Sequence, residues 1–120
     1  MTRDLQDLYF HPASEKDYRD LPDDVRHDAG YNLHLVQTGK RPEASFGPLS
    51  HLGSGVMELK LDHETDTYRV IYVAKLSEGV FVLDAFKKKS PSGRSLPKNV
   101  EARIRRRYQE AKTWNEQIAP

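Results

Sequence analysis

The chain of 120 residues contains no cysteine, a single tryptophan and two methionines. Without cysteine it has no disulfide, no thiolate nucleophile and no cysteine-ligated zinc or iron–sulfur centre. It also lacks any apolar run near the roughly 20 residues that a membrane-spanning helix needs, and its first residues lack the apolar stretch of a signal peptide. We therefore expect a single domain over residues 1–120, soluble and cytoplasmic, with no membrane association.

The motifs of several enzyme classes are missing as well. Five histidines are present, and none has metal-ligand spacing or belongs to an HExxH motif; they are His11, His27, His34, His51 and His63. There is no nucleophile elbow or dinucleotide fingerprint, and Gly53-Ser54-Gly55 lacks the lysine and the following helix of a P-loop. We expect no metal site, and His51 is a candidate acid or base whose position the sequence leaves open.

What the chain does have is charge, and that charge is unevenly distributed. Lys and Arg number 19 against 18 Asp and Glu, so the formal net charge is only +1. Residues 1–30 carry eight acids and four bases, whereas residues 87–107 carry nine bases and one acid, Glu101. The near-neutral total therefore conceals a strongly basic segment.

Hydrophobic residues recur at helical spacing in two segments. Pro22 and two following aspartates open a predicted helix over residues 22–38, whose apolar side is Val25, Ala29, Leu33 and Val36. Residues 98–112 show the same period, with Val100, Ile104, Tyr108 and Ala111 on one side and mostly arginine and lysine on the other. A weaker capping signal at Ser14 predicts a short helix near residues 14–20.

Between these helices the period changes to two. The alternation predicts a three-stranded antiparallel meander, with strands over residues 56–61, 68–76 and 80–86. Residues 8–10 could form an edge strand, and residues 39–55 are expected to be a loop pinned by Phe46 and Leu49. We therefore expect an α+β domain in which helices cover one face of the sheet. The other face could be open.

The strand register brings cations together. If Leu61 lies opposite Tyr68, so that the apolar residues share one face, Lys60 lies directly across from Arg69. Such a like-charge pair costs a few tenths to about 1 kcal/mol unless an anion or the neighbouring Glu58 compensates. The polar face of this hairpin is therefore a candidate anion site.

The second hairpin adds further lysines. A two-residue turn at Glu78-Gly79 would place Lys88 opposite Arg69, and a loop one residue longer would place Lys87 there. In either register we expect Lys60, Arg69 and the lysines at residues 87–89 to converge on one surface, for which phosphate is the obvious ligand.

Each of these cations also has a structural interpretation. Lysines at a strand end commonly keep an edge soluble, and arginines on an amphipathic helix commonly form its exposed face. Arg103 could pair with a nearby glutamate, and Arg69 could be the partner of Glu58 or Asp84. The sequence by itself leaves both interpretations open.

The order of motifs carries a resemblance. In chain order they are Leu21-Pro22 opening a helix, Gly39, Pro48-Leu49, residues 53–60, Tyr68-Arg69-Val70-Ile71-Tyr72, residues 82–89 and a final basic helix. Over about residues 8–112 the chain resembles the phage-related HigB-like toxins of the RelE/ParE superfamily. It departs from them at Lys60, where the family usually has arginine; lysine keeps the charge but lacks the planar fork of a guanidinium.

The resemblance implies a fold and an activity. The fold would be a RelE-like twisted antiparallel sheet with N-terminal helices packed on it and a basic C-terminal helix. The activity would be that of a type II toxin that cleaves messenger RNA on the ribosome without a cofactor. In that reaction the RNA 2′-OH attacks the adjacent phosphate, and cationic side chains stabilise the charge that accumulates.

Carried over by position, the resemblance implies roles for individual residues. Arg69 would stabilise the transition-state phosphate, Lys60 would activate the 2′-OH or hold the phosphate, and Lys87 or Lys88 would protonate the leaving group. The residues expected to contact RNA are Lys89, Arg94, Lys98, Arg103, Arg106 and Arg107.

Two other functions remain open at this stage. A ParE-like protein of the same fold would inhibit DNA gyrase by binding, and a nucleic-acid-binding module would have no toxicity. Either toxin function implies a partner, which we expect to be a cognate helix-turn-helix antitoxin, whereas the ribosome and mRNA would be partners of the nuclease.

Overall fold

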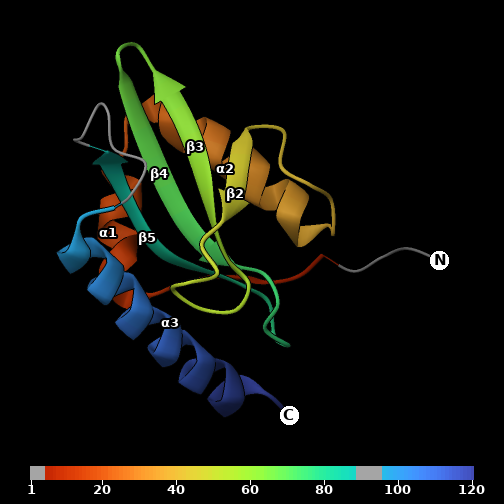
Figure 1. The fold of residues 1–120 in the computed structure, drawn as a ribbon. Coiled ribbons are helices and arrows are strands. Elements are labelled where there is room, and N and C mark those ends of the chain that lie inside the picture. Colours follow the sequence, from red (N-terminus) through yellow and green to blue (C-terminus); the bar gives the residue numbers. More distant parts are fainter. Residues whose placement is uncertain (1–4, 89–95) are drawn as a thin grey trace.

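The computed structural model describes residues 5–88 and 96–120, which form five strands and three helices (Figure 1). In chain order these are β1 (Leu8–Phe10), α1 (Pro12–Arg19), α2 (Asp23–Gln37), β2 (Ser45–Pro48), β3 (Val56–His63), β4 (Asp66–Val73), β5 (Val80–Lys88) and α3 (Lys98–Ile118). The strands form one sheet in the order β1-β5-β4-β3-β2, antiparallel except where β1 runs parallel to β5. The α+β class is confirmed.

The central meander and the edge strand at residues 8–10 are confirmed, but the loop predicted for residues 39–55 contains β2. This strand has only four residues, two of them glycine and proline, which are turn formers and weaken any strand signal. It forms because β3 offers a free edge, with Ser45 opposite Lys60.

One face of the sheet packs against α1 and α2. The predicted apolar side of α2 is fully buried there: Val25, Ala29, Leu33 and Val36 are at most 7% exposed. They meet Leu59, Leu61, Val70 and Tyr72 from the strands. The period-two and period-3.6 patterns therefore identified this half of the core correctly.

The sequence allowed the other face of the sheet to be open. In the structure α3 covers part of that face (Figure 1). Ile104, Tyr108 and Ala111 of α3 are buried against a second apolar cluster that includes Ile71 and Phe81. The helix also runs six residues beyond the predicted end at residue 112, to Ile118. Only the part of this face beyond the apolar cluster is left uncovered by α3.

Both registers predicted for the second hairpin are wrong. Arg69 lies opposite Phe86, and β4 ends at Val73, so six residues connect it to β5. Asn115 of α3 accepts a hydrogen bond from the Glu78 backbone N–H of this connection at 2.9 Å. A contact with a distant helix therefore sets the connection's length, which local turn rules cannot foresee.

Among the described residues no helix is both long and apolar enough to cross a membrane.

Two glycines give a matched test of how α3 is seated. A Cβ at Gly53 would lie 2.5 Å from Cδ2 of Tyr108, whereas a Cβ at Gly47 would have no atom within 4 Å. We expect Gly53→Ala to lower the free energy of unfolding by about 1–3 kcal/mol through overpacking. Gly47→Ala should leave it unchanged or raise it by up to about 1 kcal/mol, since alanine replaces a glycine inside a strand.

Chemical denaturation monitored by tryptophan fluorescence would measure both variants, because Trp114 lies on α3 and stacks edge-on against Tyr9 and Phe81. Equal stability of the two variants would contradict the tight contact between Gly53 and Tyr108.

Candidate functional site

The predicted pairing of the first hairpin is confirmed: Leu61 lies opposite Tyr68 and Lys60 opposite Arg69. Lys60 and Arg69 therefore share the face of the sheet on which α3 packs. Their side chains differ in environment, because that of Lys60 is 41% exposed and that of Arg69 only 8%. One cation is accessible to solvent and the other is held beneath the surface.

Glu58 compensates for this like-charge pair. Its Oε2 accepts a hydrogen bond from Nη1 of Arg69 at 2.5 Å, and both side chains are 8% exposed. Nζ of Lys60 lies 3.9 Å from the other carboxylate oxygen of Glu58. Of the two structural partners considered for Arg69, the structure selects Glu58 and not Asp84.

One polar atom of this arrangement remains unsatisfied. Nε of Arg69 is buried and has no hydrogen-bond partner within the described residues. A buried N–H donor without an acceptor is unfavourable, and Nε of Arg107, inside the protein, is in the same state. Glu58 therefore satisfies only part of the Arg69 guanidinium.

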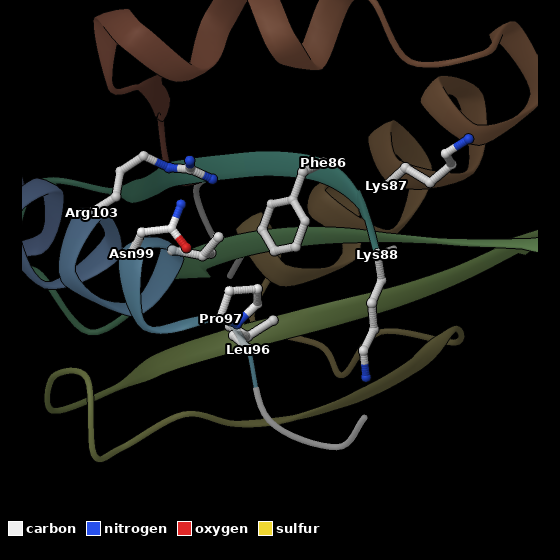
Figure 2. A pocket seen from close by; sticks show the side chains of 8 residues that line it. Phe86, Lys87, Lys88, Leu96, Pro97, Asn99 and Arg103 are labelled. Atoms are coloured by element: carbon white, nitrogen blue, oxygen red, sulfur yellow. The ribbon is translucent and has the colours of Figure 1, made fainter. Parts of the chain in front are cut away.

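Alternation along β5 places Lys88, and not Lys87, on the same face as Arg69. Lys88 lies opposite Thr67 and Lys87 opposite Tyr68, which faces α1 and α2. Figure 2 shows the two side chains pointing in different directions, and Nζ of Lys87 lies 3.9 Å from Asp66.

The surroundings of Lys88 lower the pKa of its side chain. Burial and, next, the positive charge of Arg69 lower the pKa of the Lys88 ammonium, with a smaller lowering effect from Lys60. The carboxylate of Glu58 acts in the opposite direction. Lys88 is therefore electrostatically coupled to the other three residues, and we refer to Glu58, Lys60, Arg69 and Lys88 as the cation cluster.

The cation cluster is approachable from the side of β2. Gly47 lies opposite Glu58, and the space in which its side chain would project is open. Ser45, opposite Lys60, is exposed. A ligand can thus come close to the backbone of β2 while it contacts the charged side chains of β3 and β4.

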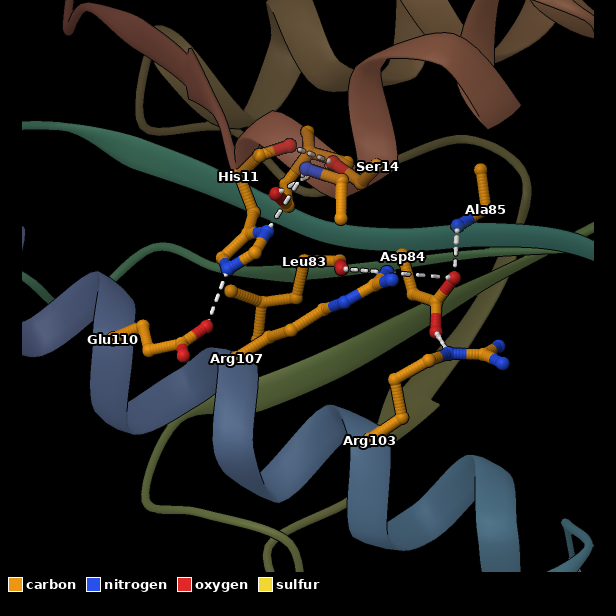
Figure 3. A network of polar contacts seen from close by, with 10 residues as sticks. His11, Ser14, Leu83, Asp84, Ala85, Arg103, Arg107 and Glu110 are labelled. Atoms are coloured by element: carbon orange, nitrogen blue, oxygen red, sulfur yellow. Dashed lines mark hydrogen bonds and ion pairs between the residues drawn. The ribbon is translucent and has the colours of Figure 1, made fainter.

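A second buried acid, Asp84, holds two of the arginines of α3 (Figure 3). Ile71 pairs with Asp84 and Tyr72 with Val82, so Leu83 is an extra residue in β5. This bulge turns Leu83 and Asp84 toward α3 together. Nε of Arg103 lies 2.7 Å from Asp84.

Arg107 is the second arginine bound to Asp84, and it lies inside the protein. Its Nη1 donates to the Leu83 carbonyl at 3.0 Å and lies 3.3 Å from Asp84. With Arg107 only 7% exposed, this residue is not on the exposed face of α3 where RNA contact was expected. Its spacing, three residues after Ile104 and four before Ala111, was a signal that it lies on the buried side of the helix. The acid that binds it comes from a distant strand, which the helix pattern could not show.

The other candidate RNA-contacting residues are placed differently. Lys98 and Arg106 are exposed on α3, and Arg103 is partly exposed. Lys89 and Arg94 lie outside the described residues.

Two of the histidines lie beside glutamates of α3. Nε2 of His51 lies 3.0 Å from Glu101, and Nε2 of His11 lies 2.6 Å from Glu110. Within residues 5–88 and 96–120, no three His, Cys, Asp or Glu side chains are grouped as metal ligands would be.

The cation cluster has the chemistry of a phosphate site with its own proton acceptor. Three cations can share the negative charge of a phosphodiester, and Glu58 is the one cluster member that can accept a proton while the cations stay charged. From the sequence, Glu58 is predicted only as a counter-ion. Its alternation with Lys60 along β3 was the available signal that it belongs to the same surface.

Comparison with known proteins gives one match. A family model described as Phage derived protein Gp49-like (DUF891) matches residues 16–109. No curated protein and no solved structure matches. The matched range runs from α1 into α3 and includes every residue of the cation cluster. The chain therefore belongs to the phage-derived Gp49-like family, a RelE/HigB-like toxin family.

Proposed function

We propose that this protein is a HigB-like toxin of a type II toxin–antitoxin system that cleaves messenger RNA on the ribosome. The observation that carries the proposal is the cation cluster, in which three cations and one carboxylate meet on a surface that a ligand can reach. A merely structural pairing of Arg69 with Glu58 would not need two further lysines beside it, since the pair is already neutral. Membership in the Gp49-like family supports the same function.

The reaction divides among the four side chains. The RNA 2′-oxygen attacks the adjacent phosphorus, the bond from phosphorus to the 5′-oxygen breaks, and the products are a 2′,3′-cyclic phosphate and a free 5′-OH. Arg69 and Lys60 bind the non-bridging oxygens, where negative charge increases in the transition state. Glu58 accepts the proton of the 2′-OH, and Lys88 donates a proton to the departing 5′-oxygen.

The position of Lys88 suits a proton donor. A lysine with its ordinary pKa holds its proton too tightly to be an efficient general acid near neutral pH. Burial and the charge of Arg69 lower the pKa of Lys88 and so weaken that hold. The same neighbours that bind the phosphate therefore also prepare the proton transfer.

The helix α3 also carries exposed cations. Lys98 and Arg106 would hold the phosphate backbone of mRNA or ribosomal RNA without reading its sequence, a contact that weakens as salt increases. Three cations against one carboxylate give the cation cluster a net positive charge, which also suits a partner, and we propose that a helix-turn-helix antitoxin covers the cluster. Neutralisation of toxicity by co-expression of the adjacent reading frame would test that partner.

The two adjacent lysines of β5 provide the sharpest test of the site. We expect Lys88→Ala to reduce mRNA cleavage by about 10²–10³-fold, because it removes both a phosphate contact and the proton donor. Lys87→Ala removes the same charge one residue away, on the opposite face, and should retain cleavage within a factor of about three. Mapping of transcript 5′ ends after a short pulse of expression would measure both.

Three outcomes of that mapping, combined with an assay for DNA breakage, would count against the proposal. Unchanged 5′ ends with the wild-type protein would exclude the nuclease, and DNA breakage with intact mRNA would indicate a gyrase inhibitor instead. Equal loss of cleavage in the two lysine variants would show that the face of the sheet is irrelevant.

The pH dependence of cleavage tests the role of Lys88. A general acid is active only when protonated, so the rate should fall as the pH rises through the pKa of Lys88, which lies below that of an ordinary lysine. Lys60 lowers this pKa, so Lys60→Gln should move the alkaline limb to higher pH while it reduces the maximal rate. Single-turnover cleavage across a pH series would measure the limb, and a limb that stays in place or moves to lower pH would contradict the assignment.

A further inference from the structure

A hollow adjoins the cation cluster between the end of β5 and the first turn of α3. Its volume is about 520 Å³. Phe86, Leu96 and Val100 supply apolar walls, and Lys88, Asn99 and Arg103 supply the polar groups. Lys87 also borders the hollow, but its side chain points in a different direction from that of Lys88 (Figure 2). Figure 2 shows the Phe86 ring between Lys88 on one side and Asn99 and Arg103 on the other.

The walls of the hollow suit a flat aromatic ring that carries negative charge nearby. Phe86 offers a ring to stack on, and the guanidinium carbon of Arg103 lies 5.9 Å from the centre of that ring. Asp84 holds Arg103 through Nε at 2.7 Å, which fixes the plane of the guanidinium beside the hollow. The volume of the hollow lies within the range of small-molecule binding sites.

Asn99 adds a group that can read hydrogen-bonding edges. Asn99 is exposed in the first turn of α3. The N-cap residue of this helix is Pro97, and the helix has no side-chain capping hydrogen bond. A carboxamide both donates and accepts, which is the combination that pairs with the edge of a nucleobase.

Lys88 connects the hollow to the cation cluster. It lines the hollow, and its pKa responds to Arg69, Glu58 and Lys60. A phosphate bound by the cluster would therefore have one of its two flanking nucleosides beside the hollow.

We propose that this hollow is a nucleobase subsite, which binds the base of a nucleotide next to the scissile phosphate. The inference rests on the proposed function, because it takes RNA as the ligand. Stacking on Phe86 beside Arg103 would supply the affinity, and Asn99 would discriminate among bases. The subsite would thus give the toxin its preference for the sequence around the cut.

Binding of short 2′-O-methyl trinucleotides, which cannot be cleaved, tests the subsite in the full chain. One probe carries all three bases, and two others have an abasic ribose on the 5′ or the 3′ side of the central phosphate. We expect one abasic probe to bind the wild-type protein about tenfold more weakly than the complete probe, the order of magnitude of one stacked base. Fluorescence titration at low salt would measure the three affinities.

Two exposed positions on α3 provide the matched variants. Asn99→Trp fills the hollow and should reduce the ratio between complete and abasic probes to about one, whereas Gln109→Trp, exposed further along the same helix, should preserve it. Phe86→Leu, which keeps the wall apolar but removes the ring, should reduce the ratio as well.

The outcomes separate the subsite from the proposed function. Equal binding of complete and abasic probes by the wild type, or an unchanged ratio in Asn99→Trp, would overturn the subsite while loss of mRNA cleavage in Lys88→Ala still supported the nuclease. Absence of both trinucleotide binding and mRNA cleavage would overturn the proposed function and the subsite together.

Discussion

The cation cluster depends on the buried ion pair between Glu58 and Arg69. The two side chains come from neighbouring strands and lie beneath the surface, with only 8% of each exposed. Desolvation makes such a pair a weak source of stability, and well-packed apolar residues often serve a core equally well, although removal of one partner alone is costly. The pair is therefore better explained by what it does for its neighbours. The Glu58 carboxylate offsets the repulsion between the Arg69 guanidinium and the two lysines, Lys60 and Lys88, so that three cations can occupy one small area.

The face of the sheet that carries Arg69 has two regions, one covered by α3 and one that carries the cation cluster. Where α3 docks, the buried acid is Asp84, and it is neutralised by Arg103 and Arg107 from the helix. Where α3 does not reach, the acid is Glu58, and its cationic partners come from the sheet itself. The β-bulge at Leu83 separates these two regions, because it turns Asp84 toward the helix and sets the register that brings Lys88 to the Arg69 face. Arg103 touches both regions, since it is bound to Asp84 and lines the hollow beside Lys88.

This division changes the meaning of the basic segment. Counted along the sequence, the bases of residues 87–107 form one positive block, which suggests a single nucleic-acid surface. In the structure they have different tasks: Arg107 stabilises the core, Lys87 lies on the opposite face near Asp66, and Lys88 belongs to the cation cluster. Charge density along a chain therefore overestimates the surface that a ligand can use, because a sheet and a helix each send neighbouring side chains in different directions.

Much of this protein was determined by local pattern in the sequence. The apolar side of α2, the first hairpin and the pairing of Lys60 with Arg69 follow from hydrophobic periods and a short polar turn, which act between residues close in the chain. Tertiary structure alone decided the length of the second hairpin, the presence of β2, the burial of Arg107 and the choice of Lys88 over Lys87. The first three depend on a partner distant in sequence: Asn115 for the hairpin, the free edge of β3 for β2, and Asp84 for Arg107. The choice of Lys88 follows from the β-bulge at Leu83, which shifts the register of β5 against β4. Hydrophobic periodicity predicts which residues share a face of a helix or strand. It does not predict which distant element covers that face. Here α3 covers part of the sheet face, and the cation cluster lies on the part that α3 leaves uncovered.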